Sequence, residues 1–139
     1  MVLRGFSHSL EKPLLIVLAA AIFDAEGRVL LARKRAGTSN AGLWEFPGGK
    51  LEPGEHEAEG LRREIGEELG LEITVAEWFA TGYTITPKHR IELRGYRAEL
   101  CGGTLQLSDH DAVVWVAPHE LATYSLPEAD LPLAAALQL

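Results

Sequence analysis

Cysteine and basic residues are both scarce in this sequence. Cys101 is the single cysteine, so an internal disulfide is excluded and a reducing cytosol is the expected environment. Lysine and arginine together number 13 against 20 aspartates and glutamates, which gives a net charge of −7. Nucleic-acid surfaces depend on clustered basic side chains that neutralise phosphates. The composition therefore disfavours a nucleic-acid partner.

Long apolar segments are also lacking. The longest apolar run, Leu14–Phe23, is too short to cross a bilayer and predicts a buried strand. Residues 1–12 lack the basic region, apolar run and small-residue cleavage site of a secretory signal. With 139 residues and 47% hydrophobic content, the chain is expected to form one domain over residues 1–139. We expect a cytoplasmic protein with no membrane partner.

The hydrophobic patterns and turn residues predict an order of elements typical of an α/β or α+β domain. Gly70 is the expected C-cap of the longest helix. The expected elements are strands at 14–23, 28–33 (a hairpin partner of the first), 73–85, 91–100 and 113–116, and helices at 57–69, 118–124 and 128–137.

The helix predicted at 57–69 carries an unusual ridge of glutamates. At about 100° per residue, Glu57, Glu64 and Glu68 lie within about 20° of one another, and Glu67 lies about 80° away on the side remote from the apolar stripe. Like charges at i,i+4 destabilise a helix by a few tenths of a kcal/mol, so stability does not account for the ridge. Mg²⁺ or Mn²⁺, which prefer oxygen ligands, would relieve the repulsion.

A glycine-containing loop, residues 46–50, precedes this helix and lets the backbone approach a ligand closely. Glu55 lies near the positive N-terminus of the helix, and Arg63 lies one turn before Glu67. Arg63 is suited either to orient a carboxylate or to meet a phosphate. The simpler interpretation of so short a pattern is a solvated acidic helix with ordinary ion pairs.

The pattern is longer than that interpretation requires, and it resembles the signature of the Nudix hydrolase family at every specified position. The matching residues are Gly49, Glu55, Arg63, Glu64, Ile65, Glu67, Glu68, Gly70 and Leu71. The resemblance implies an α/β/α sandwich with a mixed β-sheet and a loop-helix-loop catalytic motif. It also implies that Glu64, Glu67 and Glu68 hold the metal ions, with the carbonyl of Gly48 as a further ligand, and that Glu55 supports the loop.

Three further segments, 42–50, 103–106 and 127–132, resemble the MutT-type branch of this family. That likeness implies attack of water on the β-phosphorus of a nucleoside triphosphate, with release of a monophosphate and pyrophosphate. The expected substrates are modified or surplus nucleotides such as 8-oxo-dGTP, CTP or 5-methyl-dCTP, and the expected cofactor is Mg²⁺, with Mn²⁺ as an alternative.

Several side chains outside the signature are candidates for binding or catalysis. MutT-type enzymes use an Asn or Asp near Asp130 to recognise the base, although an acid in the first turn of the last helix explains this residue equally well. Asp109, in a loop predicted at 109–111, is the candidate for an additional catalytic carboxylate, with turn formation as the alternative. The remaining substrate-binding candidates are Lys34, Arg35, Trp44, Phe46 and Lys50.

Each of these further candidates has an ordinary structural explanation. Lys34 and Arg35 suit an exposed basic cluster after an edge strand, and aromatic residues at strand positions usually belong to the core. At the level of function, a hydrolase of ADP-ribose or another nucleoside diphosphate derivative is the first alternative. A nucleotide-binding module without catalysis is the second, and the intact glutamates argue against it. Monomer and homodimer both remain open.

Overall fold

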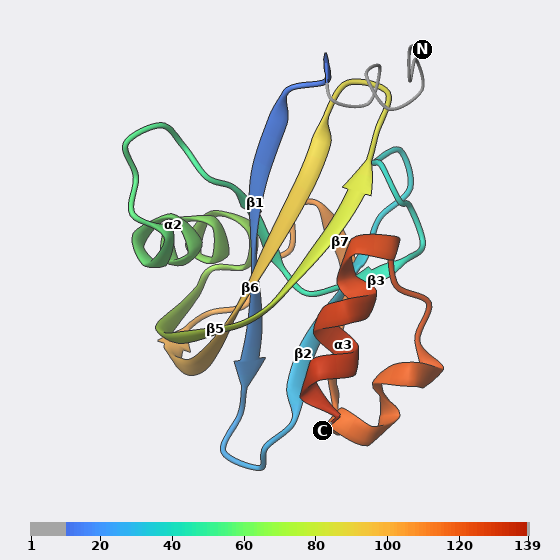
Figure 1. The fold of residues 1–139 in the computed structure, drawn as a ribbon. Helices are drawn as coiled ribbons and strands as arrows, with labels where there is room; N and C mark the ends of the chain where they lie inside the picture. The colour runs from blue at the N-terminus through green and yellow to red at the C-terminus, as the bar shows by residue number, and fades with distance from the viewer. Residues whose placement is uncertain (1–10, 139) are drawn as a thin grey trace.

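The computed structural model describes residues 11–138, and the predicted absence of a secretory signal falls largely on residues outside this range. A mixed sheet lies between α2 on one side and α3 on the other (Figure 1). The predicted α/β/α sandwich with a mixed sheet is confirmed. The strands are β1 (Leu14–Phe23), β2 (Val29–Lys34), β3 (Trp44–Glu45), β4 (Gly48–Lys50), β5 (Leu71–Ile85), β6 (Arg90–Gly103) and β7 (His110–Val116); the helices are α2 (Glu57–Leu69), η1 (Pro118–Thr123), η2 (Glu128–Asp130) and α3 (Leu131–Leu137).

The first strand, β1, is apolar along its whole length because both faces of the sheet are covered. Leu18 and Ile22 face the core beneath α2, whereas Ala19 and Ala21 face the core beneath α3. In the sheet β1 runs parallel to β6 along its whole length and antiparallel to β4. The long apolar run is therefore the central strand, as predicted.

The glutamate-bearing helix α2 has the predicted bounds and the predicted apolar face. Leu61, Ile65 and Leu69 are fully buried against the sheet. Gly70 ends the helix in the left-handed conformation, with φ of 68°, and its N–H donates to the carbonyl of Gly66. The amphipathic pattern thus fixes which face of α2 is left for the glutamates.

Three predictions of local structure need correction. The predicted hairpin of β1 and β2 forms, but it is paired at a single position, Phe23 with Val29, because β3 pairs with the same edge of β2 from Ala32 onward. The loop predicted at 109–111 is mostly strand, since β7 begins at His110. The terminal helix begins as the 3-10 turn η2 and becomes α-helical only at Leu131, immediately before a proline at a favourable first-turn position. Among residues 11–138, no helix is long and apolar enough to cross a membrane.

Candidate active site

A cavity of about 430 Å³ lies where the glycine loop meets α2. Strand β4 brings Gly48 and Gly49 beside β1, and Glu64 and Glu68 reach the cavity from α2. Its opposite wall is apolar and comes from the parallel pair β1 and β6. The lining residues are Leu15, Val17, Lys34, Glu45, Gly48, Gly49, Lys50, Glu64, Glu68 and Ile91. The cavity thus joins oxygen ligands, two lysines and an apolar wall.

The absence of a side chain at Gly49 makes room for Glu64. A Cβ at this position would collide with the Glu64 carboxylate and come within 2.9 Å of its Cγ. A Cβ at Gly48 would collide with the carbonyl of Leu18 on β1. The two glycines therefore serve separate purposes: Gly48 lets the loop pack on the central strand, and Gly49 lets a carboxylate lie against the loop.

This arrangement predicts that Gly49→Ala displaces Glu64 while the fold survives, because the end of a glutamate side chain can rotate away. We expect kcat to fall about 10- to 100-fold, since a shift of about 1 Å in a reacting group costs on that order. Gly66→Ala is the matched control: no atom lies within 4 Å of its added Cβ, and alanine stabilises a helix interior by up to about 1 kcal/mol. Equal activity of the two variants would contradict the steric role of Gly49.

Arg63 orients the carboxylates around it. Its guanidinium donates to both oxygens of Glu55, at 2.7 and 2.9 Å, and to Glu64 Oε1 at 3.0 Å. It also reaches Glu67 Oε2 at 3.3 Å and the carbonyl of Lys50 at 3.2 Å. These bonds hold the pKa of Glu55 at about 2, with the Arg63 hydrogen bonds as the main cause and the N–H of Glu52 adding to them. Of the two roles left open by the sequence, the structure shows Arg63 orienting carboxylates.

Glu68 is held in an environment that disfavours its charge. Burial is the largest cause, followed by the charges of Glu64, Glu45 and Asp109; together they raise the pKa of Glu68 to about 8 although Lys34 opposes the shift. Its Oε2 is buried without a hydrogen-bond partner within residues 11–138. A carboxylate oxygen that is buried and unpaired beside a second carboxylate suits a hard divalent cation. The residues present therefore fit the metal that the sequence predicted.

The remaining signature glutamates differ in environment. Glu67 is exposed, with 62% of its side-chain surface accessible, whereas the side chain of Glu64 is 14% accessible. Glu57, which shares the predicted ridge, is drawn away from the cavity. It accepts hydrogen bonds from Tyr96 and Arg94 of β6, and so ties the first turn of α2 to the sheet.

Asp130 is buried at 5% exposure, and its Oδ2 accepts the N–H of Phe46 at 3.1 Å. It makes no side-chain cap to α3. Burial, with a smaller contribution from Glu45, raises the pKa of Asp130 to about 7 against the opposing Phe46 hydrogen bond. Asp130 does not line the cavity itself but contacts Phe46, the residue that follows the strand carrying Glu45. Asp130 occupies the N-cap position of α3, as the structural alternative predicts, and its side chain is bound to Phe46 instead of the helix backbone.

Only some of the other predicted residues line the cavity. Lys34 and Lys50 line the cavity, whereas Arg35 is exposed and its N–H binds the carbonyl of Asp109. Asp109 is exposed and acts on Glu68 through its charge. The ring of Trp44 meets Tyr124 edge to face, at 5.6 Å between ring centroids. Phe46 is buried in the core, so its contribution to the site is the backbone N–H given to Asp130.

Glu45 is a cavity residue that the sequence reasoning missed. It lies between Trp44 and Phe46 in an extended segment, where successive side chains point to opposite faces. Because both aromatic residues pack on the core beneath α3, alternation alone places Glu45 on the other face. The signal was present in the order Trp-Glu-Phe.

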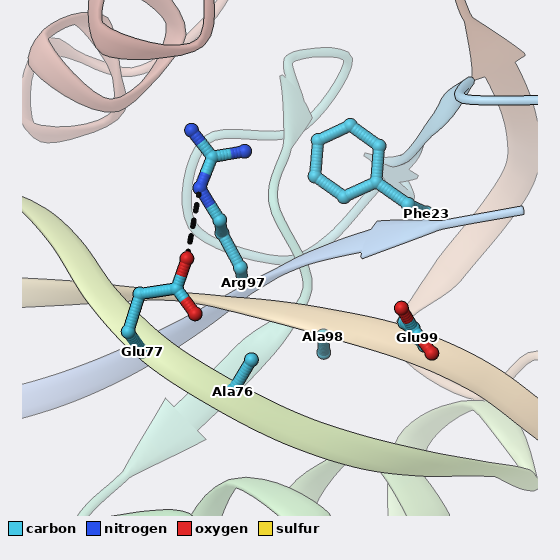
Figure 2. A pocket seen from close by; sticks show the side chains of 6 residues that line it. All are labelled: Phe23, Ala76, Glu77, Arg97, Ala98 and Glu99. Carbon is cyan, nitrogen blue, oxygen red and sulfur yellow. Dashed lines mark ion pairs between the residues drawn. The ribbon is translucent and has the colours of Figure 1, made fainter.

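A second hollow, of about 270 Å³, lies at the far end of β1 and has different chemistry. Figure 2 shows Arg97 beside the ring of Phe23 and its ion pair with Glu77. The Nε of Arg97 lies 3.5 Å from Oε1 of Glu77. The ring of Phe79 lies against the same guanidinium: the Cζ of Arg97 is 5.4 Å from the centroid of this ring. Because this arginine is already neutralised and no carboxylate ridge adjoins it, the hollow at Gly49 is the better candidate for catalysis.

Comparison with known proteins decides the family. The model of the NUDIX domain family matches residues 12–137. The chain belongs to the Nudix family. The CTP pyrophosphohydrolase of Escherichia coli strain K12 is 43% identical over 119 residues, which cover 86% of this chain and 88% of that protein. The 8-oxo-dGTP diphosphatase of Haemophilus influenzae strain Rd is 28% identical over 89% of this chain and 91% of that protein.

Solved structures agree with this assignment. The crystal structure of the MutT protein from Methanosarcina mazei Go1 has a TM-score of 0.81 and 28% identity, with 94% of each chain covered. This Nudix protein is therefore an enzyme of the pyrophosphohydrolase class, and the alternative of a module without catalysis is set aside. Nudix hydrolases generally use divalent metal ions and act on nucleotide derivatives.

Proposed function

We propose that this Nudix enzyme is a Mg²⁺-dependent nucleoside triphosphate pyrophosphohydrolase that removes modified or surplus nucleotides. The observation that carries the proposal is the unpaired, buried Glu68 oxygen beside Glu64 in a cavity that also contains Lys34 and Lys50. Carboxylates attract divalent cations, and the lysines attract the phosphates that such cations bridge. The similarity to a CTP pyrophosphohydrolase supports the triphosphate as substrate.

The chain's residues divide the work of hydrolysis. Glu64, Glu67 and Glu68 would hold the metal ions together with the carbonyl of Gly48, and one of the three glutamates accepts the proton of the attacking water. Bound Mg²⁺ would neutralise charge on the phosphates and lower the pKa of a water molecule. Arg63 keeps Glu55 and Glu64 in fixed positions, so that the ligands need little rearrangement when substrate arrives.

The phosphates and the base occupy different parts of the site. Lys34 and Lys50 are placed to bind phosphate oxygens that extend beyond the carboxylates. Asp130 lies close to Glu45, because Phe46, the neighbour of Glu45, donates its N–H to Asp130. A carboxylate accepts hydrogen bonds from the amino group of cytosine, and a protonated carboxyl group donates to a ring nitrogen or carbonyl oxygen. The pair therefore suits recognition of the base edge.

The test is a panel of CTP, dCTP, 5-methyl-dCTP, 8-oxo-dGTP, dGTP and ADP-ribose, assayed with Mg²⁺ and compared by kcat/KM. We expect one triphosphate to exceed ADP-ribose by at least about 10-fold, because the cavity offers a site for one base and a run of phosphates. Preference for ADP-ribose would retain the Nudix chemistry and overturn the proposed substrate class.

A further inference from the structure

Glu45 is held from behind by a buried histidine. His110 of β7 is 2% exposed, and its Nε2 lies 2.9 Å from Oε2 of Glu45. The two residues come from strands on either side of β2: Glu45 pairs with Ala32, and His110 pairs with Lys34 beyond a register shift. Hydrogen bonding of β2 to both strands therefore fixes the distance between the two side chains.

One ring nitrogen of His110 has a hydrogen-bond partner and the other has none among residues 11–138. When Glu45 is ionised it can only accept, so Nε2 must carry the hydrogen of this bond. Nδ1 is buried and has no hydrogen-bond partner within residues 11–138. A buried polar atom without a partner is unfavourable, and an apolar residue would fill the position without that cost. Stability alone therefore does not explain a histidine here.

Glu45 also needs something to keep it in the cavity. Glu45 lines the same cavity as Glu64 and Glu68, so three carboxyl groups share this wall. Like-charge repulsion favours rotation of a flexible glutamate side chain away from them. A charge-assisted hydrogen bond from a rigid, buried ring opposes that rotation.

We propose that His110 is a positioning residue that fixes the Glu45 carboxylate at the wall of the nucleotide cavity and thereby sets the affinity for substrate. The inference rests on the proposed function, which places substrate in this cavity. His110 itself does not line the cavity and touches no reacting atom, so it acts through Glu45. The glutamates of α2, and not His110, take part in the bond making and breaking at phosphorus.

Two amide substitutions separate positioning from simple filling of space. His110→Gln carries an N–H donor at the place of Nε2, whereas His110→Asn carries its amide at the place of Nδ1 and falls short of Glu45. We expect His110→Asn to raise KM about 10- to 100-fold with kcat changed less than about 3-fold, because a hydrogen bond to a charged group is lost. We expect His110→Gln to recover most of the affinity. Equal KM values for the two variants would overturn the proposal.

A double-mutant cycle shows whether His110 acts through Glu45. In the Glu45→Gln background, His110→Asn should change KM by less than about 2-fold, since the bond it removes has already been weakened. The same large change in both backgrounds would mean that His110 acts independently. His119→Asn is the matched control, because His119 is exposed in η1, and it should leave KM unchanged. The melting temperature of each variant tests whether it remains folded.

The cycle uses whichever nucleotide the unaltered enzyme hydrolyses best, so it does not depend on the triphosphate being the substrate. Failure of the proposed function is seen with the unaltered enzyme alone, as a preference for ADP-ribose. Failure of the positioning role is seen in the cycle, as additive effects or as equal behaviour of the glutamine and asparagine variants.

Discussion

Glu68→Gln is expected to lower kcat by about 10²- to 10⁴-fold while the protein stays folded. The substitution removes one negative charge from the proposed metal ligands, and charge stabilisation of this kind contributes several kcal/mol to the transition state. Glutamine has nearly the same shape, and Glu68 lies off the apolar face of α2 that packs on the sheet. Initial rates at saturating Mg²⁺ and substrate measure the loss.

The same variant should be more stable than the unaltered protein when metal is absent. The folded-state pKa of Glu68 is about 8, above its ordinary value of 4.5, so the folded protein binds more protons than the unfolded chain between these values. Stability therefore falls as pH rises from about 4.5 to 8, and glutamine removes this loss. Thermal unfolding in a chelator at pH 5 and pH 8 should show the variant gaining melting temperature relative to the unaltered protein as pH rises.

Glu59→Gln is the matched control for both measurements. Glu59 lies on the same helix and is exposed, so its neutralisation should leave kcat nearly unchanged. Near-normal turnover in folded Glu68→Gln would remove this residue from the metal site. A fall of equal size in both variants would indicate a general effect of helix charge instead.

Asp130→Asn is expected to change the ranking among bases more than it changes the metal requirement. Asparagine can still accept the N–H of Phe46, so the local packing is retained, but it cannot carry the carboxyl proton or the negative charge. A contact to one base edge discriminates by about 1–3 kcal/mol, so the ratio of kcat/KM for CTP to that for 8-oxo-dGTP should shift by about 10-fold or more.

The pH dependence of stability provides an independent check on Asp130. Its folded-state pKa is about 7 against an ordinary value of 3.8, so the folded protein holds a proton that the unfolded chain releases between these values. This group's effect is a loss of stability as pH rises from about 4 to 7. The asparagine variant lacks that loss and should gain melting temperature, relative to the unaltered protein, over this interval.

Glu128→Gln serves as the control for Asp130→Asn. Glu128 is exposed two residues earlier and accepts a hydrogen bond from Thr84, which a glutamine oxygen can also accept. Its substitution should change neither the base ranking nor the pH dependence. An equal loss of activity on every nucleotide in Asp130→Asn would undermine a role in base recognition and favour a structural one.

Local pattern was enough to predict the helix that carries the glutamates. The 3.6-residue period of Leu61, Ile65 and Leu69 fixes the buried face of α2, and Gly70 supplies the left-handed residue that ends it. The continuous apolar run Leu14–Phe23 likewise identifies a strand covered on both faces. These features depend on neighbours in sequence, which is why residue order alone reveals them.

Features that depend on pairing between distant strands were not predicted. The sequence has no signal that β3 and β7 pair with opposite edges of β2, and these two pairings are what bring His110 to Glu45. Asp130 presents a similar case, because its hydrogen-bond partner Phe46 lies 84 residues away in the sequence. The arrangement of residues on α2 was readable from the helix itself, whereas the placement of Glu45, His110 and Asp130 required the sheet topology.

The most direct test of the proposed hydrolysis is the identity of the products formed in ¹⁸O-labelled water. The enzyme would be incubated with Mg²⁺ and the triphosphate that it hydrolyses best, and the products would be resolved by mass spectrometry. Attack at the β-phosphorus predicts nucleoside monophosphate and pyrophosphate, with the label in pyrophosphate. Label in the monophosphate would contradict the site of attack, and release of inorganic phosphate with a nucleoside diphosphate would contradict the pyrophosphohydrolase itself.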